Sequence, residues 1–289
     1  MKNYILLLFA FLLLPVLVVS QEMKQDSIQD KAERPAFEGT TLINNPTNVL
    51  FNKNTFEVML QHRFGTINGG TNDLAGIYGA ANIRIGLSYA IHDRLTIGYG
   101  TTKLKSYQDF NWKVGILEQT RSGKIPVNIS YYGNFVVDAR NKGRGLFPTE
   151  QSRYSYFNQL IISRRFSPKL SLQVAPSISH YNLADTRMPN DVIALAVGGR
   201  FKITDQTAIL VDYSHPFIHH LNDVEFDEDP EPGFSLGVEF STSGHAFQLF
   251  LSNYNGIVPQ QNYMYNQNDF FKGGTDILIG FNITRNYNF

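Results

Sequence analysis

From residue 54 to the C-terminus, apolar and polar positions alternate with a period of two, which is typical of β-strands. In one such segment Leu170, Leu172 and Val174 alternate with Ser171 and Gln173. Segments of this kind, bounded by turn residues, predict strands near residues 54–64, 77–90, 94–103, 107–118, 125–138, 152–165, 169–181, 190–202, 206–214, 232–241, 244–255 and 274–287. Most of them reach the roughly 9–11 residues with which a tilted strand crosses a bilayer.

The connections between these segments alternate along the chain between tight and generally longer ones. Tight turns are predicted at residues 92–93, 122–124, 167–168, 204–206 and 243–244. The other connections are predicted at residues 66–76, 105–107, 139–151, 182–190, 215–232 and 256–274. Transmembrane β-barrels have short periplasmic turns and longer extracellular loops. The pattern therefore predicts an all-β fold, a single antiparallel transmembrane β-barrel of about twelve strands.

The N-terminus has the pattern of an export signal. Lys2 precedes an unbroken apolar run from Ile5 to Val19, and the chain becomes polar after Ser20. This pattern predicts a signal peptide over residues 1–20 and export to the outer membrane of a Gram-negative cell. An uncleaved anchor is the alternative, although the run is short for a spanning helix.

The segment between the predicted signal and the first strand, residues 21–53, has no extended alternation. It includes the small apolar groups Leu42–Ile43 and Val49–Phe51. It is interpreted as a periplasmic N-terminal leader or strap, and a partial plug of the barrel lumen stays open as an alternative. Residues 54–289 are expected to form the barrel domain.

Composition fits an export and membrane setting. Charged residues make up 17% of the chain, below the roughly 25% of ordinary soluble domains. The formal net charge is zero, so no nucleic-acid partner is expected. There is no cysteine, which excludes disulfides and thiolate metal sites, and no cofactor is expected. The expected partners are outer-membrane lipid and the outer-membrane assembly machinery, and the terminal strand ends on the aromatic Phe289.

Polar residues on the face opposite the apolar one are candidates for lining the lumen, because a membrane barrel turns its apolar face to lipid. The candidates are Arg84, Lys113, Asn128, Tyr132, Gln173, Arg200, Glu239, Gln248 and Asn282. Charges of both signs inside a barrel either select a solute or close the lumen through salt bridges. Two functions follow: a channel or uptake protein for small solutes, or a closed structural or binding barrel that contacts a partner through its outer loops.

A histidine and acid cluster in the connection at residues 215–232 is the strongest candidate for other chemistry. His215, His219 and His220 precede a run of acidic residues, and imidazoles and carboxylates bind metals. The ligand spacing of an EF-hand or a zinc helix is missing, and a hydrated outer loop is the preferred interpretation. No serine stands in a Gly-x-Ser-x-Gly setting, so no catalytic residue is assigned and no enzyme is expected, an outer-membrane hydrolase being the third-ranked function.

Several phrases resemble those of a family of outer-membrane β-barrel proteins, found mainly in Bacteroidota, known as domain of unknown function 5777. The phrases are Gln61-His62-Arg63-Phe64-Gly65, Ala80-Ala81-Asn82-Ile83-Arg84-Ile85-Gly86-Leu87, Asp93-Arg94-Leu95-Thr96-Ile97-Gly98, His245-Ala246-Phe247-Gln248-Leu249 and Gly280-Phe281-Asn282-Ile283. The resemblance extends from about residue 37 to the C-terminus. It implies a barrel and a location, and it implies no activity or ligand residues.

Overall fold

The computed structural model describes residues 30–289 apart from 142, 144, 186–187, 219–228 and 243. Residues 1–20, predicted as a signal peptide, lie outside the described residues. Internal contacts divide the chain into residues 1–31 and 32–289. Everything that follows concerns the second unit.

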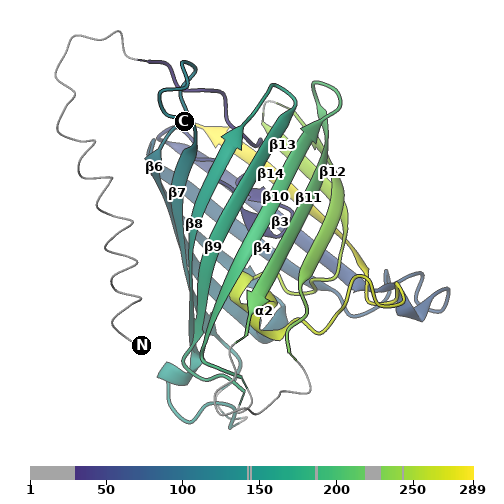
Figure 1. Ribbon diagram of the computed structural model, residues 1–289. Coiled ribbons are helices and arrows are strands. Elements are labelled where there is room, and N and C mark those ends of the chain that lie inside the picture. The colour runs from purple at the N-terminus through teal and green to yellow at the C-terminus, as the bar shows by residue number, and fades with distance from the viewer. Residues whose placement is uncertain (1–29, 142, 144, 186–187, 219–228, 243) are drawn as a thin grey trace. The chain divides into compact units, whose positions relative to one another are not determined.

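A closed antiparallel β-barrel of twelve strands forms the body of this unit, which confirms the predicted fold class (Figure 1). The strands are β3 (Thr55–Thr66), β4 (Asn82–His92), β5 (Leu95–Thr102), β6 (Tyr107–Leu117), β7 (Asn128–Asp138), β8 (Tyr154–Arg165), β9 (Leu170–Tyr181), β10 (Asp191–Lys202), β11 (Thr207–Phe217), β12 (Gly233–Ser241), β13 (His245–Ser252) and β14 (Leu278–Asn288). Each strand pairs with its neighbours in sequence, and β14 pairs with β3 to close the barrel. The sheet therefore has no free edge.

The two faces of the strands differ in the way the alternation predicts. On the outer face Ile193 is 56% exposed and Leu249 is 47% exposed. On the inner face Gln173 and Gln248 are buried, at 1% and 4% exposure. Apolar side chains on the outside and polar ones within are the arrangement of a barrel that lipid surrounds.

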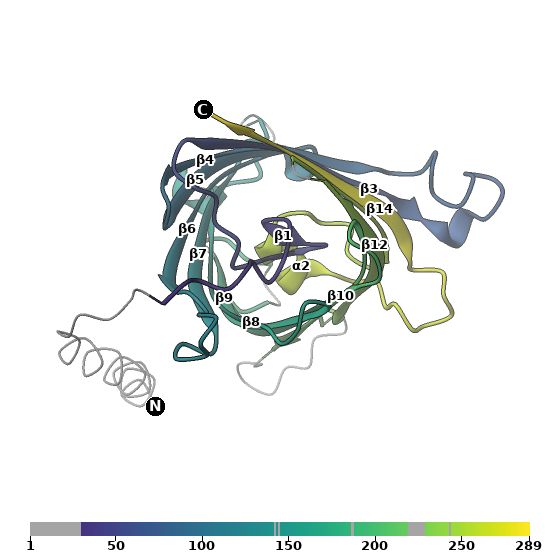
Figure 2. The ribbon, with the colours of Figure 1, turned by 90° about the horizontal axis from the view of Figure 1, so that it is seen from above.

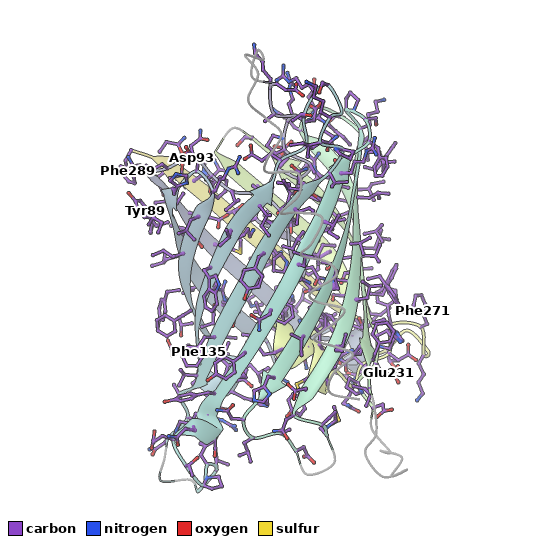
Figure 3. The ribbon with its side chains drawn as sticks, turned by 60° about the vertical axis from the view of Figure 1, so that its left-hand side comes forward. Tyr89, Asp93, Phe135, Glu231, Phe271 and Phe289 are labelled. Carbon is purple, nitrogen blue, oxygen red and sulfur yellow. The ribbon has the colours of Figure 1, made fainter. Side chains whose placement is uncertain are left out.

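The connections differ in length between the two ends of the barrel. Phe289, Tyr89 and Asp93 lie at one end (Figure 3). The connections at this end are residues 93–94, 118–127, 166–169, 203–206 and 242–244. The connections at the opposite end are residues 67–81, 103–106, 139–153, 182–190, 218–232 and 253–277. We call the end with Phe289 and Asp93 the turn end, and the opposite end the loop end.

Several boundaries differ from the predicted ones. Residues 215–217 were predicted in a connection but belong to β11, and residues 274–277 were predicted as strand but precede β14. The predicted tight turn at residues 122–124 is part of the longer connection 118–127. Residues 77–81 were predicted as strand but lie in a connection, where Leu74 and Ala75 have positive φ angles and Gly76 follows with φ 86°. Residues 253–255 leave the sheet after β13 ends. A short apolar run is too short to show whether its period is that of a strand, which explains the error at residues 77–81.

Helices are few in the described chain. The described residues form the 3-10 turns η1 (Ile67–Gly69), η2 (Leu104–Ser106) and η4 (Gln151–Arg153) and one α-helix, α2 (Pro259–Tyr265). Within residues 30–289, leaving the gaps aside, no helix has the length and apolarity needed to cross a bilayer.

The space inside the barrel holds secondary structure of its own. The strands β1 (Thr41–Leu42) and β2 (Asn45–Pro46) form a small hairpin. Viewed along the barrel, this hairpin and α2 lie inside the ring of strands (Figure 2). The candidate site is built from these two insertions and the wall that faces them.

Candidate functional site

Residues 36–50, here called the plug segment, enter the lumen before the first barrel strand begins. They turn back sharply at Ile43, whose φ of 52° is left-handed, and Thr41 pairs with Pro46 across the turn. Thr47 adds two local bonds, because its backbone N–H donates to Thr40 O at 2.9 Å and its hydroxyl donates to Gly39 O at 2.7 Å. The segment is therefore a compact hairpin and not an extended strand.

An apolar cluster anchors the plug segment to the wall. Phe37, Leu42 and Ile43 are buried together with the inward-facing wall residues Leu210 and Phe250. Burying an aliphatic or aromatic side chain contributes roughly 1.5–3 kcal/mol. This cluster therefore stabilises the docked plug segment relative to a plug segment that has left the lumen and is exposed to water.

Polar side chains of the wall bind the main chain of the plug segment. Gln248 on β13 donates to Thr41 O at 3.0 Å and accepts from Ile43 N at 3.3 Å. Asn282 on β14 donates to Ile43 O at 2.8 Å, and Arg63 on β3 donates to the same oxygen at 3.3 Å. The peptide groups of the turn are thus satisfied by the wall, as buried peptide groups require.

Two wall groups of opposite charge hold Thr40. Its hydroxyl donates to the two Glu57 carboxylate oxygens at 2.8 and 3.0 Å. Lys113 donates to Thr40 O at 3.1 Å and to Val49 O at 3.1 Å. Glu57 lies on β3 and Lys113 on β6, and both are buried. Neither charge has an ion pair within 4 Å in the described structure, so peptide dipoles and a hydroxyl solvate them.

A second pair of wall charges surrounds the tip of the hairpin. Asp212 on β11 accepts from Asn44 N at 3.0 Å and from Asn45 Nδ2 at 2.6 Å. Arg63 donates to Asn44 Oδ1 at 3.0 Å, and its guanidinium stands 4.5 Å from the centre of the Phe250 ring. Asn44 therefore bridges an acid and a base that lie on different parts of the wall.

The connection between β13 and β14 fills the lumen from the loop end. Tyr263 on α2 packs against Phe157 with ring centres 5.6 Å apart, and Tyr254 bonds to Ser214 of the wall at 2.8 Å. The Tyr263 hydroxyl donates to Asn45 Oδ1, so the two insertions meet. Burial raises the pKa of the Tyr263 hydroxyl well above its ordinary value, which keeps its proton available for this bond.

A ring of aromatic residues fixes α2 to the loop end of the wall. Tyr107 on β6 donates to Gln261 at 3.0 Å, and Tyr181 on β9 packs edge-on to Tyr265 at 5.2 Å. The Lys105 ammonium lies 4.8 Å from the Tyr265 ring centre, a cation–π contact. Burial lowers the pKa of Lys105, and Arg140 lowers it further. The α2 insertion is thus held by side-chain contacts at both of its ends.

A polar cavity of about 70 Å³ remains between the plug segment, the start of α2 and the wall. Glu57, Arg84, Asp109, Lys113 and Tyr132 are among the side chains that line it. A cavity of this volume with polar walls holds a few water molecules. It gives water access to the charged groups that hold the plug segment.

The predicted lumen residues fall on the inner face in several different settings. Lys113, Gln173, Gln248 and Asn282 each donate to a main-chain oxygen of the plug segment.

The other predicted residues contact one another or the wall, and Arg200 also pairs with Glu38 of the plug segment at 3.5 Å. Arg84 pairs with Asp109 at 2.7 Å, and Arg200 pairs with Glu239 at 2.8 Å. Tyr132 lines the cavity. Asn128 accepts from the backbone N–H of Gln119 at 3.0 Å, near the turn end, and contacts neither insertion through a described hydrogen bond.

Three residues that hold the plug segment are absent from the sequence-based candidates: Glu57, Arg63 and Asp212. Asp109, the partner of the candidate Arg84, is absent as well. The sequence does contain a signal for Asp109, because it precedes the candidate Lys113 by four residues on the same strand and therefore lies on the same face. The contacts of Arg63 and Asp212 with Asn44 have no signal in the sequence, since they join residues far apart in the chain.

Of the three histidine candidates for a metal, only His215 lies among the described residues. His215 lies on the outer face of β11, with its ring 4.9 Å from that of Phe217. His219 and His220 lie outside the described residues. Among the residues that are described, no group of three or more His, Cys, Asp or Glu side chains is arranged to hold a metal ion.

Solved structures of bacterial barrels resemble this chain in outline. The KdgM porin matches with 6% identity and a TM-score of 0.47, over 81% of this chain and 99% of that one. An outer membrane channel from Pseudomonas putida F1 matches with 10% identity and a TM-score of 0.49, over 83% and 97%. Outer membrane phospholipase A from Escherichia coli matches with 10% identity and a TM-score of 0.40, over 91% and 94%. At such low identity and score they assign no function to this chain.

No match was found among curated proteins. The sequence profile of a membrane bound beta barrel domain, domain of unknown function 5777, matches residues 37–287. The match includes most of the plug segment, all twelve barrel strands and α2. It confirms the resemblance found in the sequence. The chain therefore belongs to the family of membrane-bound β-barrel domains known as domain of unknown function 5777.

Proposed function

We propose that this protein is an outer-membrane channel for small polar solutes, and that its own plug segment holds it closed at rest. In this proposal the turn end faces the periplasm and the loop end faces the outside. The plug segment enters from the turn end, and α2 covers the lumen from the loop end.

One observation carries the proposal: the plug segment fills the lumen but forms no part of the barrel sheet. Its two short strands pair only with each other, and the barrel closes through β14 and β3. Withdrawal of the segment would therefore break side-chain contacts but no hydrogen bond of the barrel ladders. A barrel that keeps its wall intact while the lumen empties has the property that a gated channel requires.

The inner wall supports the same proposal. Small barrels can be closed by their own inward side chains, and larger ones enclose a channel or a plug. Here Gln173, Gln248 and Asn282 point inward and bind the plug segment through groups that water can replace. In an empty lumen, water would form hydrogen bonds with these side chains, so they would not be left without partners.

A closed barrel with a binding role is the second candidate. The apolar cluster of Phe37, Leu42 and Ile43 with the wall favours it, because its exposure to water opposes withdrawal. The two candidates differ in one respect: only the channel conducts when the plug segment is weakened.

The test is a planar-bilayer recording of the full chain and of the variant Asn44→Ala/Asn45→Ala. The substitutions remove the bonds from Asn44 to Ser235, at 2.8 Å, and from Asn45 to Asp212, at 2.6 Å. With a loss of about 1 kcal/mol for each bond, we expect the open probability to rise about tenfold or more.

The control is Asn52→Ala, because Asn52 is exposed and lies just after the plug segment. It should record like the parent chain. Correct folding of each protein is checked by its shift on detergent gels between unboiled and boiled samples. Zero conductance from a folded Asn44→Ala/Asn45→Ala variant at all voltages would reject the channel in favour of the closed barrel.

A further inference from the structure

The lumen wall is arranged to bind a peptide main chain. Its side chains donate to the carbonyl oxygens of Thr40, Thr41, Ile43, Pro46 and Val49. They also accept from the backbone N–H groups of Ile43 and Asn44. Donors and acceptors thus follow the main chain around both arms of the hairpin, whatever side chains it has.

At the start of the plug segment, Glu38 pairs with Arg200 of the wall at 3.5 Å. The hairpin that follows offers no counterpart to the wall charges around it. Residues 39–52 contain no charged side chain. Four buried wall groups nevertheless face this segment, the acids Glu57 and Asp212 and the bases Arg63 and Lys113. Two charges of each sign are costly to bury against a neutral partner, and they are met here by peptide dipoles, amides and a hydroxyl.

A ligand with one positive and one negative end would satisfy these groups better than the plug segment does. Ammonium suits Glu57 or Asp212, and carboxylate suits Arg63, whose planar group presents paired donors. A short peptide with free termini has both ends and also the main-chain groups that Gln173, Gln248 and Asn282 bind.

We propose that the lumen wall recognises short peptides with uncharged side chains and free termini, and that the plug segment occupies this site as an internal substitute. The inference rests on the proposed channel function, since it requires the plug segment to leave. A peptide would compete with the plug segment for the same wall groups, so binding and opening would favour each other.

The test measures peptide binding and conductance on the same preparations. The probe is the synthetic hexapeptide with the sequence of residues 41–46 and free termini, and its control is the same peptide with an acetylated N-terminus and an amidated C-terminus. The protein is the full-length Asn44→Ala/Asn45→Ala variant in detergent micelles, in which the tethered competitor is weakened. Binding is measured by titration calorimetry, and block of the current is measured in bilayers.

We expect the hexapeptide to bind this variant about tenfold more tightly than the parent chain, because a tethered segment competes at a high effective concentration. Adding Lys113→Met should reduce the affinity about tenfold by removing one charged donor. The matched control is Lys202→Met, because Lys202 pairs with the exposed Asp205 near the turn end, and it should leave the affinity unchanged.

Each combination of results decides a claim. Conductance without peptide binding, or binding that the peptide with blocked ends equals and Lys113→Met leaves unchanged, overturns the peptide site and leaves the channel. Binding that requires free termini, without conductance, overturns the channel and supports a barrel that captures peptides. If Lys113→Met does not fold, Gln173→Leu replaces it, since Gln173 donates to Pro46 O at 3.1 Å.

Discussion

The Tyr263 hydroxyl donates a hydrogen bond to Asn45 Oδ1 and so joins the two insertions that fill the lumen. Tyr263 belongs to α2 from the loop end, and Asn45 belongs to the hairpin from the turn end. The two segments that fill the lumen are therefore in direct contact, and a change at this bond should affect how firmly the plug segment is held.

Tyr263→Phe should loosen the plug segment without loosening α2. The substitution removes the bond to Asn45 but keeps the ring packed on Phe157. A lost hydrogen bond of about 1 kcal/mol predicts about a fivefold rise in open probability in bilayer recordings. Tyr254→Phe is the control, because its bond goes to Ser214 of the wall; an equal rise in both variants would contradict a specific role for the Tyr263 bond.

Gly198→Val should displace the plug segment by steric overlap. A Cβ atom at Gly198 would overlap Leu42 Cδ2, and Leu42 is held in the buried apolar cluster. Overpacking of this kind costs about 1–3 kcal/mol. Here it destabilises the docked plug segment, so the open probability should rise about fivefold to a hundredfold.

The control for that variant is Gly199→Val. Gly199 faces outward on the same strand, and a Cβ there would meet only Leu172 Cδ2 at 3.2 Å. Its recordings should match those of the parent chain. If the two variants open equally, the contact between Leu42 and the wall does not hold the lumen closed.

Arg200→Met should weaken the barrel itself. Arg200 and Glu239 form an ion pair of 2.8 Å, with side chains 7% and 2% exposed. Removing one partner of a buried pair costs about 3–5 kcal/mol. Unfolding in urea from lipid vesicles should show this loss. Lys202→Met breaks a pair with a fully exposed Asp205 and should cost less than about 1 kcal/mol; equal losses would show that Arg200 is hydrated and not buried.

Leu249→Arg should reduce folding into lipid. Leu249 lies near the middle of β13 on the outer face. An arginine at the bilayer midplane of a barrel costs about 2–4 kcal/mol. Leu183→Arg is the control, since Leu183 is similarly exposed but lies in the connection at the loop end. The folded fraction in vesicles measures both, and equal yields would place the outer face of β13 in water.

The barrel was predictable from sequence because each strand repeats one simple rule. The alternation at Leu170, Leu172 and Val174 shows which residues of that strand face outward and which face the lumen. Tight turns such as 204–206 show where strands end. The same rule failed at residues 77–81, which lie in a connection just after the left-handed residues Leu74, Ala75 and Gly76, and whose apolar side chains resemble those of a strand.

The contents of the lumen were less predictable. Leu42 and Ile43 stood out as apolar, but four strand residues in a hairpin are too few to give a period. Residues 259–265 were assigned to an outer connection, because a short helix without an apolar stripe has no helical signature. The contacts between Asn44 and Asp212 depend on the closure of the barrel, which brings distant segments together.

For the lumen to open, the plug segment must leave its site, and a reversible lock tests this requirement most directly. A Cβ atom at Gly198 would overlap Leu42 Cδ2, so these two positions are chosen for a disulfide, and the natural chain has no cysteine to interfere. In the background of Asn44→Ala/Asn45→Ala, single-channel recordings of Leu42→Cys/Gly198→Cys should show a silent channel when oxidised and openings within minutes of adding a reductant. Conductance that is the same before and after reduction, with the disulfide confirmed by mass spectrometry, would contradict the claim.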